Sequence, residues 1–347
     1  MEDVAAKLRS FWTDSERKPL WKVAFELARV GWHERELPAH YFSRCLYRRN
    51  INNYLDYIGN RRIEGLRATV SPRSEIPLLE DKLYFQLIFE RAGIRLPRML
   101  GHNFGGTFHD RTPASILSPG EFRRILGSVL ENSSDGVVFI KPRNGMSGKG
   151  IRRVTSKILG EAGLLQCLHG EVIAGSYIFQ EALVQHSAVS AIYSNSINTI
   201  RMDTFVHDDG HAEPLSAYMR FGSDGRYVDS GSMGGCFVGV DFQTGCLHAL
   251  GNRLLKFGGN TDVHPTTGFR FNGFEVPFFA EVQSLVTQAA LVTAGNRLVG
   301  WDVAILPDGP ALIEGNHNYA MDAIEIAYGG YRRHPTFAMI LEKFAPL

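Results

Sequence analysis

The sequence predicts an α+β protein, with helices first and strands that carry polar residues later in the chain. Residues 1 to about 70 contain apolar residues at helical spacing, whereas residues 137–140 and 237–241 are short apolar runs typical of buried strands. Two further apolar runs, residues 301–306 and 311–313, flank the turn residues 307–310, which indicates a β-hairpin. We therefore expect an N-terminal helical region followed by strand-rich parts.

The composition is that of an ordinary globular protein, with 347 residues, 44% hydrophobic and 21% charged. A net charge of +1 and a pI near 7.8 argue against general nucleic-acid binding. The longest apolar stretches fall short of the ~20 residues that cross a bilayer, and the N-terminus lacks the apolar region of a signal peptide. The four cysteines show no Cys-x-x-Cys spacing, so we expect thiols in a reducing cytoplasm and no zinc site. The oligomeric state stays open, with a homodimer as one option.

The first 70 residues are predicted to form amphipathic helices. The first helix has apolar residues at helical spacing: Leu20, Val23, Ala24, Leu27 and Ala28. Gly31 is a plausible end for it, and further pieces begin at Pro38 and near Tyr54. The region is locally basic through six arginines: Arg44, Arg48, Arg49, Arg61, Arg62 and Arg67. Two interpretations stay open, a solvated helix face or a landing site for an acidic partner or a phosphorylated substrate.

The middle of the chain is predicted to continue with helices and loops. A helix is expected over residues 80–92, followed by a short strand at residues 94–97. Residues 101–120 are rich in Gly, Pro, Thr and His and are predicted as a loop. Ser118, with Glu121 three residues later, predicts the start of another helix. Near the C-terminus, helices are expected over residues 277–294 and 335–344.

A glycine-rich loop follows the predicted strand 137–140. Residues 141–150 begin with Lys141 and Pro142 and contain Gly145, Ser147, Gly148, Lys149 and Gly150. Glycines let backbone N–H groups wrap an anion, and the lysines supply positive charge. The spacing matches neither a Walker loop nor a protein-kinase loop. The alternative interpretation is an ordinary hairpin turn.

Three oxygen-bearing side chains interrupt the predicted C-terminal hairpin. Asp302, Glu314 and Asn316 stand among apolar residues, where a carboxylate is costly unless it has a partner. Glu314 and Asn316 share a strand face, and an odd-length connection or a bulge brings Asp302 to that face. Oxygen ligands of this kind suit Mg²⁺. The alternative is a hairpin end whose acids only cap loops.

Two predicted strands each contain an arginine among apolar residues. Arg201 lies in residues 196–205 and Arg220 in residues 217–221. A guanidinium in such a place needs a carboxylate or phosphate partner, which a buried ion pair also provides. Another strand, residues 178–184, contains Glu181, whose carboxylate can bind a ribose or an amino group. A second glycine-rich loop spans residues 231–235.

Taken in order, these motifs resemble the ATP-grasp superfamily over residues 78–318. The succession consists of Asp81-Lys82, Lys141-Pro142 with its glycine loop, Gln180-Glu181, Asn198 to Arg201, and Asp302 with Glu314-x-Asn316. The sequence is most similar to the sugar-transfer-associated branch. That branch is suggested by Gln185-His186, Gly234-Gly235, His264-Pro265-x-Thr267-Gly268 and Gly300-Trp301-Asp302.

The resemblance implies an ATP-grasp fold, in which two α+β subdomains clamp ATP after an N-terminal helical region. The implied parts are a helical region over residues 1–75, a nucleotide-clamping subdomain over 76–185 and a subdomain with the metal site over 186–347. It implies that ATP contacts Lys82, Lys141, Gly145, Ser147, Gly148, Lys149, Glu181, Leu183 and His186. The implied ligands of Mg²⁺, or alternatively Mn²⁺, are Asp302, Glu314 and Asn316. Arg201 and Arg220 are the implied catalytic residues, and Asn198, Ser232 and His264 border the acceptor substrate.

The implied activity is an ATP-dependent ligase that joins a small carboxylate to an amine. An acyl phosphate is the implied intermediate, with ADP and phosphate as products. Two alternatives stay open: a phosphotransferase acting on a small molecule or sugar, and a protein that binds the nucleotide without turnover. The intact set of metal ligands argues against the last alternative.

Overall fold

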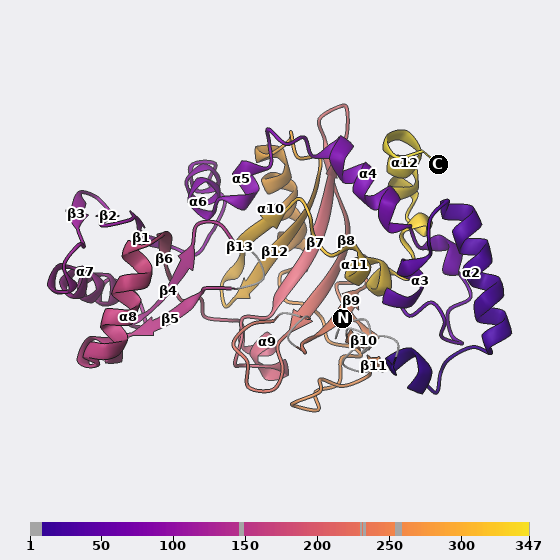
Figure 1. Ribbon diagram of the computed structural model, residues 1–347, viewed down its shortest axis with the longest axis horizontal. Coiled ribbons are helices and arrows are strands. Elements are labelled where there is room, and N and C mark those ends of the chain that lie inside the picture. The colour runs from indigo at the N-terminus through magenta and orange to yellow at the C-terminus, as the bar shows by residue number, and fades with distance from the viewer. Residues whose placement is uncertain (1–8, 146–148, 230, 232–233, 254–258, 347) are drawn as a thin grey trace. The chain divides into compact units, whose positions relative to one another are not determined.

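The computed structural model describes residues 9–145, 149–229, 231, 234–253 and 259–346 (Figure 1). The predicted α+β class and the helical N-terminal region are confirmed, because helices accompany a six-stranded and a seven-stranded sheet with antiparallel pairing. The chain divides into two compact units. The first unit comprises Met1–Ile76, Gln185–Pro310 and Gly315–Leu347, and the second comprises Pro77–Val184 and Ala311–Glu314. Among the described residues, no helix is both long and apolar enough to cross a membrane.

The N-terminal part of the first unit contains α2 (Leu20–Glu34), α3 (Ala39–Ser43), the short 3-10 helix η1 (Tyr54–Asp56) and α4 (Asn60–Val70). Val23 and Val30 of α2 pack into a core with the tyrosines at positions 41, 47, 54 and 57. Gly31 does not end α2 as predicted, because the helix continues to Glu34 and ends at Arg35, whose φ is +52°. Leu20, Ala24 and Ala28 of the predicted apolar face are exposed, and only Val23 of that face is fully buried.

The sheet of the first unit has the order β11-β10-β9-β8-β7-β12-β13. Its strands are β7 (Thr199–Val206), β8 (Ala212–Phe221), β9 (Cys236–Val240), β10 (Leu247–Arg253), β11 (Asn260–Thr261), β12 (Leu298–Leu306) and β13 (Gly309–Asn316). The helices after Val184 are α9 (Ser187–Ile192), α10 (Phe279–Val292), α11 (Met321–Tyr328), η5 (Tyr331–Arg333) and α12 (Pro335–Phe344). One hydrophobic cluster joins α4, α11 and α12 to Phe205, Tyr218 and Phe237 of the sheet.

The sheet of the second unit has the order β3-β2-β1-β6-β4-β5. Its strands are β1 (Met99–Phe104), β2 (Thr107–His109), β3 (Pro113–Ser115), β4 (Val137–Pro142), β5 (Arg152–Thr155) and β6 (Ser176–Glu181). The helices are α5 (Pro77–Glu80), α6 (Lys82–Arg91), α7 (Pro119–Glu131), η2 (Ser156–Gly160) and α8 (Ala162–Ile173). Phe122 and Leu126 of α7 pack with Leu168 of α8 against Val138 and Phe179 of the sheet.

Two predicted segments of this unit are wrong and one is confirmed. Residues 94–97 form no strand, and residues 101–120 contain β2, β3 and most of β1 instead of a continuous loop. These strands are held by antiparallel backbone pairing. The composition of the segment, rich in Gly, His and Thr, does not predict strands, because side-chain propensity for strands is weak there. The predicted helix start at Ser118 is confirmed as a capping box, in which Ser118 and Glu121 satisfy each other's backbone N–H groups.

Candidate functional site

Two lysines and a carboxylate interact electrostatically in the second unit. Lys141 lies near the end of β4, where it pairs with Ile178 of β6. Burial lowers the pKa of Lys141 to about 8, an effect that Glu314 opposes and Lys82 reinforces. Burial also lowers the pKa of Lys82, again against the attraction of Glu314. Two amino groups around one carboxylate leave a net positive charge, which suits phosphate oxygens.

The start of α6 is tied to the segment that leads into the glycine-rich loop. The Lys82 backbone N–H donates to the Arg143 carbonyl at 2.9 Å, and its Nζ donates to the Gly145 carbonyl at 2.8 Å. Asp81 accepts from the backbone N–H of Leu83 at 2.9 Å as the N-cap and also pairs with Arg143. These contacts hold Lys82 beside the beginning of the loop.

The described ends of the glycine-rich loop use conformations that favour glycine. Gly145 has φ +142° and Gly150 has φ +75°, and a Cβ at Gly150 would lie 2.9 Å from the Pro142 ring. Lys149 is exposed. Ser147 and Gly148, two of the predicted nucleotide contacts, lie outside the described residues.

Glu181, predicted to bind ATP, is held by partners within the second unit. Its carboxylate accepts from the Ser134 backbone N–H at 3.0 Å and from Arg98 Nε at 2.6 Å. Burial alone would raise the pKa of Glu181, but these hydrogen bonds outweigh burial and the pKa is lowered. The carboxylate is therefore ionised and oriented. Leu183, on the connector that follows, is half-buried.

In the first unit, the two predicted catalytic arginines meet at one carboxylate. Antiparallel pairing places Asp302 of β12 opposite Arg201 of β7. Asp302 accepts from Arg201 Nε and, at 2.7 Å, from Arg220 Nη2. Arg220 also approaches Asp229 at 3.2 Å and donates to the hydroxyl of Thr199. The two arginines and Asp302 therefore form one ionic network on the sheet. The sequence had predicted separate roles for them, anion binding for the arginines and metal binding for Asp302.

Beside this network lies a second carboxylate, Asp203, that the sequence reasoning missed. Asp203 is fully buried on β7 and accepts from the Ser216 backbone N–H and hydroxyl at 3.1 Å each. The hydroxyls of Tyr319, at 3.0 Å, and of Tyr331 also donate to it. Burial raises the pKa of Asp203 to about 6, although its hydrogen bonds oppose that shift. A signal was present, since an acid within an apolar strand needs partners.

The remaining predicted residues of the first unit have mostly structural partners. Asn198 is buried and donates to the carbonyl of Tyr193 at 2.6 Å. Nε2 of the buried His264 lies 2.8 Å from the Gly222 carbonyl. The His186 side chain accepts from the Ala188 backbone N–H and so caps α9. Contacts of these residues with substrate or nucleotide stay predictions, and Ser232 lies outside the described residues.

The three predicted metal ligands are divided between the units. Asp302 and Asn316 belong to the first unit, and Glu314 belongs to the second. Asp302 is buried, whereas Glu314 and Asn316 are half-buried. All three offer oxygen atoms, the donor type that Mg²⁺ prefers. The chemistry of the set therefore fits the ion, while their convergence on one ion stays a prediction.

A cavity of about 720 Å³ lies within the first unit, between α3, β10 and α11. Four arginines line it, at positions 44, 48, 253 and 333. Arg44 is buried and pairs with Glu325 at 2.8 Å and with Asp322 at 2.9 Å. Arg48 pairs with Asp14 at 2.7 Å. Arg44 and Arg48, two of the six arginines of the basic N-terminal region, therefore line a cavity, whereas Arg49 and Arg61 are exposed.

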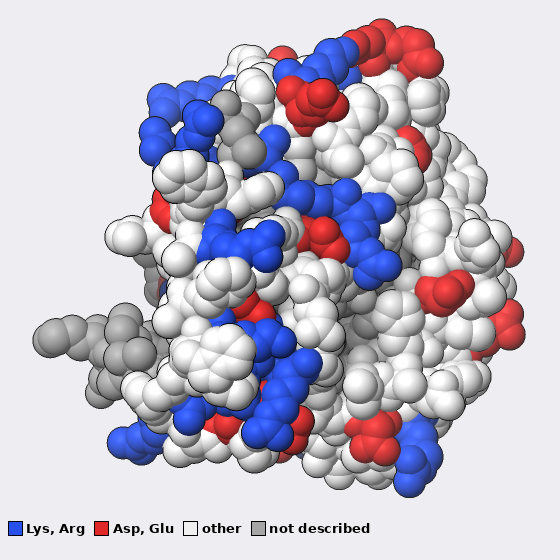
Figure 2. Space-filling view, turned by 90° about the vertical axis from the view of Figure 1, so that its right-hand side faces the viewer, with Lys and Arg blue, Asp and Glu red and all other residues white. Residues whose placement is uncertain are grey.

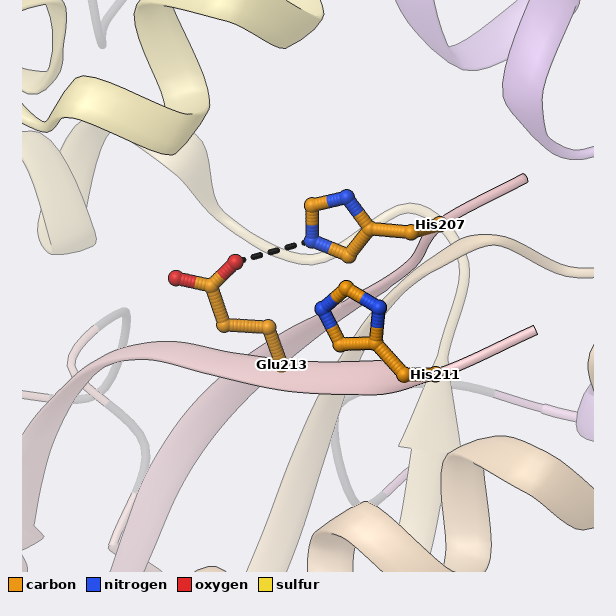
Figure 3. Close-up of side chains that lie close together, drawn as sticks. All are labelled: His207, His211 and Glu213. Carbon is orange, nitrogen blue, oxygen red and sulfur yellow. Dashed lines mark hydrogen bonds and ion pairs between the residues drawn. The ribbon is translucent and has the colours of Figure 1, made fainter. Parts of the chain in front are cut away.

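A separate cluster sits at the turn between β7 and β8. His207, His211 and Glu213 place candidate ligand atoms within 4.8 Å of one another (Figure 3). His207 Nε2 lies 2.8 Å from Glu213 Oε2. The two imidazole rings stack with centroids 4.0 Å apart and an angle of 8° between their planes. The lone pair of each imidazole nitrogen lies in the plane of its ring. Because the two ring planes are nearly parallel and stacked, one ion cannot lie in both planes, and we assign no metal to this cluster.

Several solved structures are similar in outline to this chain. The ATP-grasp ligase PsnB, complexed with minimal precursor, Mg and ADP, is 17% identical with a TM-score of 0.42, and the match covers 79% of this chain and 62% of PsnB. D-alanyl-alanine synthetase A from Vibrio cholerae is 11% identical with a TM-score of 0.45, covering 77% of this chain and 66% of that one. Biotin carboxylase from Campylobacter jejuni is 9% identical with a TM-score of 0.46, covering 78% and 47%. The chain thus spans less than two thirds of the length of PsnB.

No curated protein matches the chain. A family model described as sugar-transfer associated ATP-grasp matches residues 61–335, well over half of the sequence. The match begins at α4 and ends at the start of α12, so it includes every predicted site residue. The chain belongs to the sugar-transfer associated ATP-grasp family.

Proposed function

We propose that this protein is an ATP-dependent carboxylate–amine ligase that forms an amide through an acyl phosphate and releases ADP and phosphate. The observation that carries the proposal is the cluster of Lys82, Lys141 and Glu314 within the second unit. Its net positive charge, next to a loop with left-handed glycines, supports binding of a polyphosphate. Family membership supports ATP as the source of that polyphosphate.

In this proposal, each unit supplies one part of the chemistry. Lys82, Lys141 and the loop 145–150 bind the ATP phosphates, and Glu181 with Leu183 borders the nucleoside. Asp302, Glu314 and Asn316 would hold Mg²⁺, or Mn²⁺ as a substitute of similar ligand preference. When bound, the ion neutralises phosphate charge and polarises the transferred group.

Arg201 and Arg220 hold the acceptor carboxylate and absorb charge that develops on it. Both already pair with Asp302, so their guanidinium groups are fixed on the sheet before substrate arrives. A carboxylate oxygen attacks the γ-phosphorus while the bond to the bridging oxygen breaks, and ADP leaves. The amine nitrogen then attacks the acyl carbon, phosphate leaves with its electron pair, and the nitrogen loses a proton.

The proposed acceptor is a small anionic molecule. Arg201 and Arg220, which would hold its carboxylate, are not among the residues that line the arginine-lined cavity of the first unit, so we do not assign that cavity to the acceptor.

A matrix of acids crossed with amines, with ADP release as readout, tests the proposal. Activity that requires both components supports the ligase. ADP release with an acceptor alone, and a stable phosphorylated product, supports the phosphotransferase. An acid labelled with ¹⁸O in its carboxylate should transfer one label to the released phosphate, and label in AMP would refute the acyl phosphate.

A pair of variants ties that activity to the site. Asp302→Asn should abolish turnover because it removes a charged partner of both arginines and a predicted metal ligand. Asp262→Asn is the control, since Asp262 pairs with Arg270 at an exposed position. Equal turnover of the two variants would contradict the assignment of Asp302.

A further inference from the structure

Helix α2 is attached to the first unit through one side only. Val23, Glu26, Val30 and Glu34 are its buried residues, and their spacing of three and four defines a single inner face. Val23 and Val30 enter the tyrosine-rich core of the N-terminal part. The opposite side of the helix therefore faces away from the protein.

Both acidic residues of α2 lie on the inner face. Glu26 accepts from Lys18 Nζ and from the Tyr41 hydroxyl, each at 2.6 Å. Glu34 accepts from the Gly59 backbone N–H at 2.8 Å and pairs with Arg332. Within residues 20–34, which the structure describes completely, the outer face thus carries no carboxylate.

The outer face is aromatic. Trp21, Phe25 and Trp32 are 73%, 57% and 89% exposed, and their spacing of four and seven residues places them on one stripe. Leu20 at the start of the helix and Leu37 just beyond its end are also at least half exposed. At about 200 Å² for a large side chain, these residues expose several hundred Å² of apolar surface. That is as large as the largest apolar patch on a typical monomer, and such patches mark interaction sites.

Cations flank the aromatic stripe. Lys22 and Arg29 are seven residues apart, so both lie on the same edge of it. Arg35 follows at the helix end and is exposed. The Arg29 guanidinium lies 5.8 Å from the centre of the Phe25 ring, so charge and aromatic surface adjoin. Figure 2 shows the side of the molecule on which α2 lies, where many lysine and arginine side chains are exposed with acidic side chains among them.

We propose that the outer face of α2 binds the surface of a membrane that contains anionic lipids. Tryptophan favours the boundary between headgroups and acyl chains, and a helix with one aromatic and one basic edge lies in that plane. Lys22 and Arg29 would contact lipid phosphates, each adding attraction to an anionic surface. A second copy of this chain fits the face less well. In an antiparallel two-fold contact, the basic edge with Lys22 and Arg29 would lie against the same edge of the other copy, and the like charges would repel each other. The proposal does not depend on the ligase activity.

Flotation of the full chain with lipid vesicles tests this proposal. Wild-type protein should float with vesicles of equal parts phosphatidylcholine and phosphatidylglycerol, and much less with phosphatidylcholine alone. Trp21→Ser with Trp32→Ser, and separately Lys22→Glu with Arg29→Glu, should each lower the partition coefficient by about tenfold or more. Leu164→Ser and Lys157→Glu are matched controls at exposed positions of the second unit and should bind as wild type.

A spectroscopic readout on the wild-type chain makes the test independent of variant folding. Vesicles with brominated acyl chains should quench the fluorescence of the exposed tryptophans, whereas the buried Trp301 should be protected. Absence of quenching, or equal flotation of wild type and the tryptophan variant, would overturn the proposal. So would a concentration-dependent dimer that the tryptophan variant abolishes, because the face would then belong to a second copy of the chain.

Discussion

Replacing Asp203 by Asn should remove a pH dependence of stability that the buried network imposes on the first unit. The Asp203 carboxylate is fully buried and receives hydrogen bonds from Ser216, Tyr319 and Tyr331. Asn keeps the shape and most of the polar contacts, because the hydroxyl groups can rotate to accept from its amide. The substitution therefore removes the titration of this group while retaining the packing around it.

The magnitude follows from the pKa. Burial raises the pKa of Asp203 from its ordinary value of 3.8 to about 6. The folded state therefore binds the proton more tightly than the unfolded state, so protonation stabilises the fold. That contribution is fully present below pH 3.8 and is lost as the pH rises through about 6. A shift of about two units corresponds to about 3 kcal/mol of unfolding free energy.

Urea unfolding at a series of pH values provides the assay. Because all four tryptophans, Trp12, Trp21, Trp32 and Trp301, belong to the first unit, their fluorescence reports the unit that contains Asp203. The unfolding free energy of wild type minus that of Asp203→Asn should fall by about 2–2.5 kcal/mol between pH 4 and pH 7, the part of the full effect that lies in this range. A constant offset from altered hydrogen bonds cancels in this comparison. A difference that is flat with pH would refute the reasoning.

Lys141→Ala should weaken ATP binding by about tenfold or more in calorimetry, since charge-assisted hydrogen bonds contribute about 1.5–3 kcal/mol, and Lys157→Ala is the exposed control. The affinity of the wild type for ATP should also decline as the pH rises through about 8, where Lys141 loses its charge. An affinity for ATP that changes neither with the substitution nor with the pH would contradict the assignment. Gly300→Ala should destabilise the first unit by about 1–3 kcal/mol, because its Cβ would lie 2.5 Å from the Tyr319 ring. Gly170→Ala, in α8 with open space around it, should instead stabilise by about 0.5–1 kcal/mol in thermal melts followed by circular dichroism.

Local patterns predicted those elements whose determinants are adjacent in the chain. The capping box at Ser118 and the final helix over Pro335–Phe344 depend on a few neighbouring residues, and both are as predicted. The hairpin of β12 and β13 was recognisable from two apolar runs around Pro307 and Asp308. By contrast, β2 and β3 have only three residues each, too few to show a period.

The candidate site was predictable by residue type but not by partner. A buried arginine such as Arg201 was expected to need an anion, yet only the register of β7 against β12 reveals that the anion is Asp302. The same limit applies to α2. Apolar residues at helical spacing predicted a core face, but Leu20 is exposed, because the position of tertiary partners decides which apolar stripe is covered.

The first unit is assembled from both ends of the chain, which affects how the protein can fold during synthesis. Arg44 pairs with Asp322 across 278 residues, and Leu66 of α4 shares a cluster with Ile340 of α12. Residues 77–184 are contiguous and can begin to fold as soon as they leave the ribosome, whereas helix α4 completes its hydrophobic cluster only after α11 and α12 have been synthesised. Loss of α12 would therefore remove Ile340 and its neighbours from the cluster that covers α4.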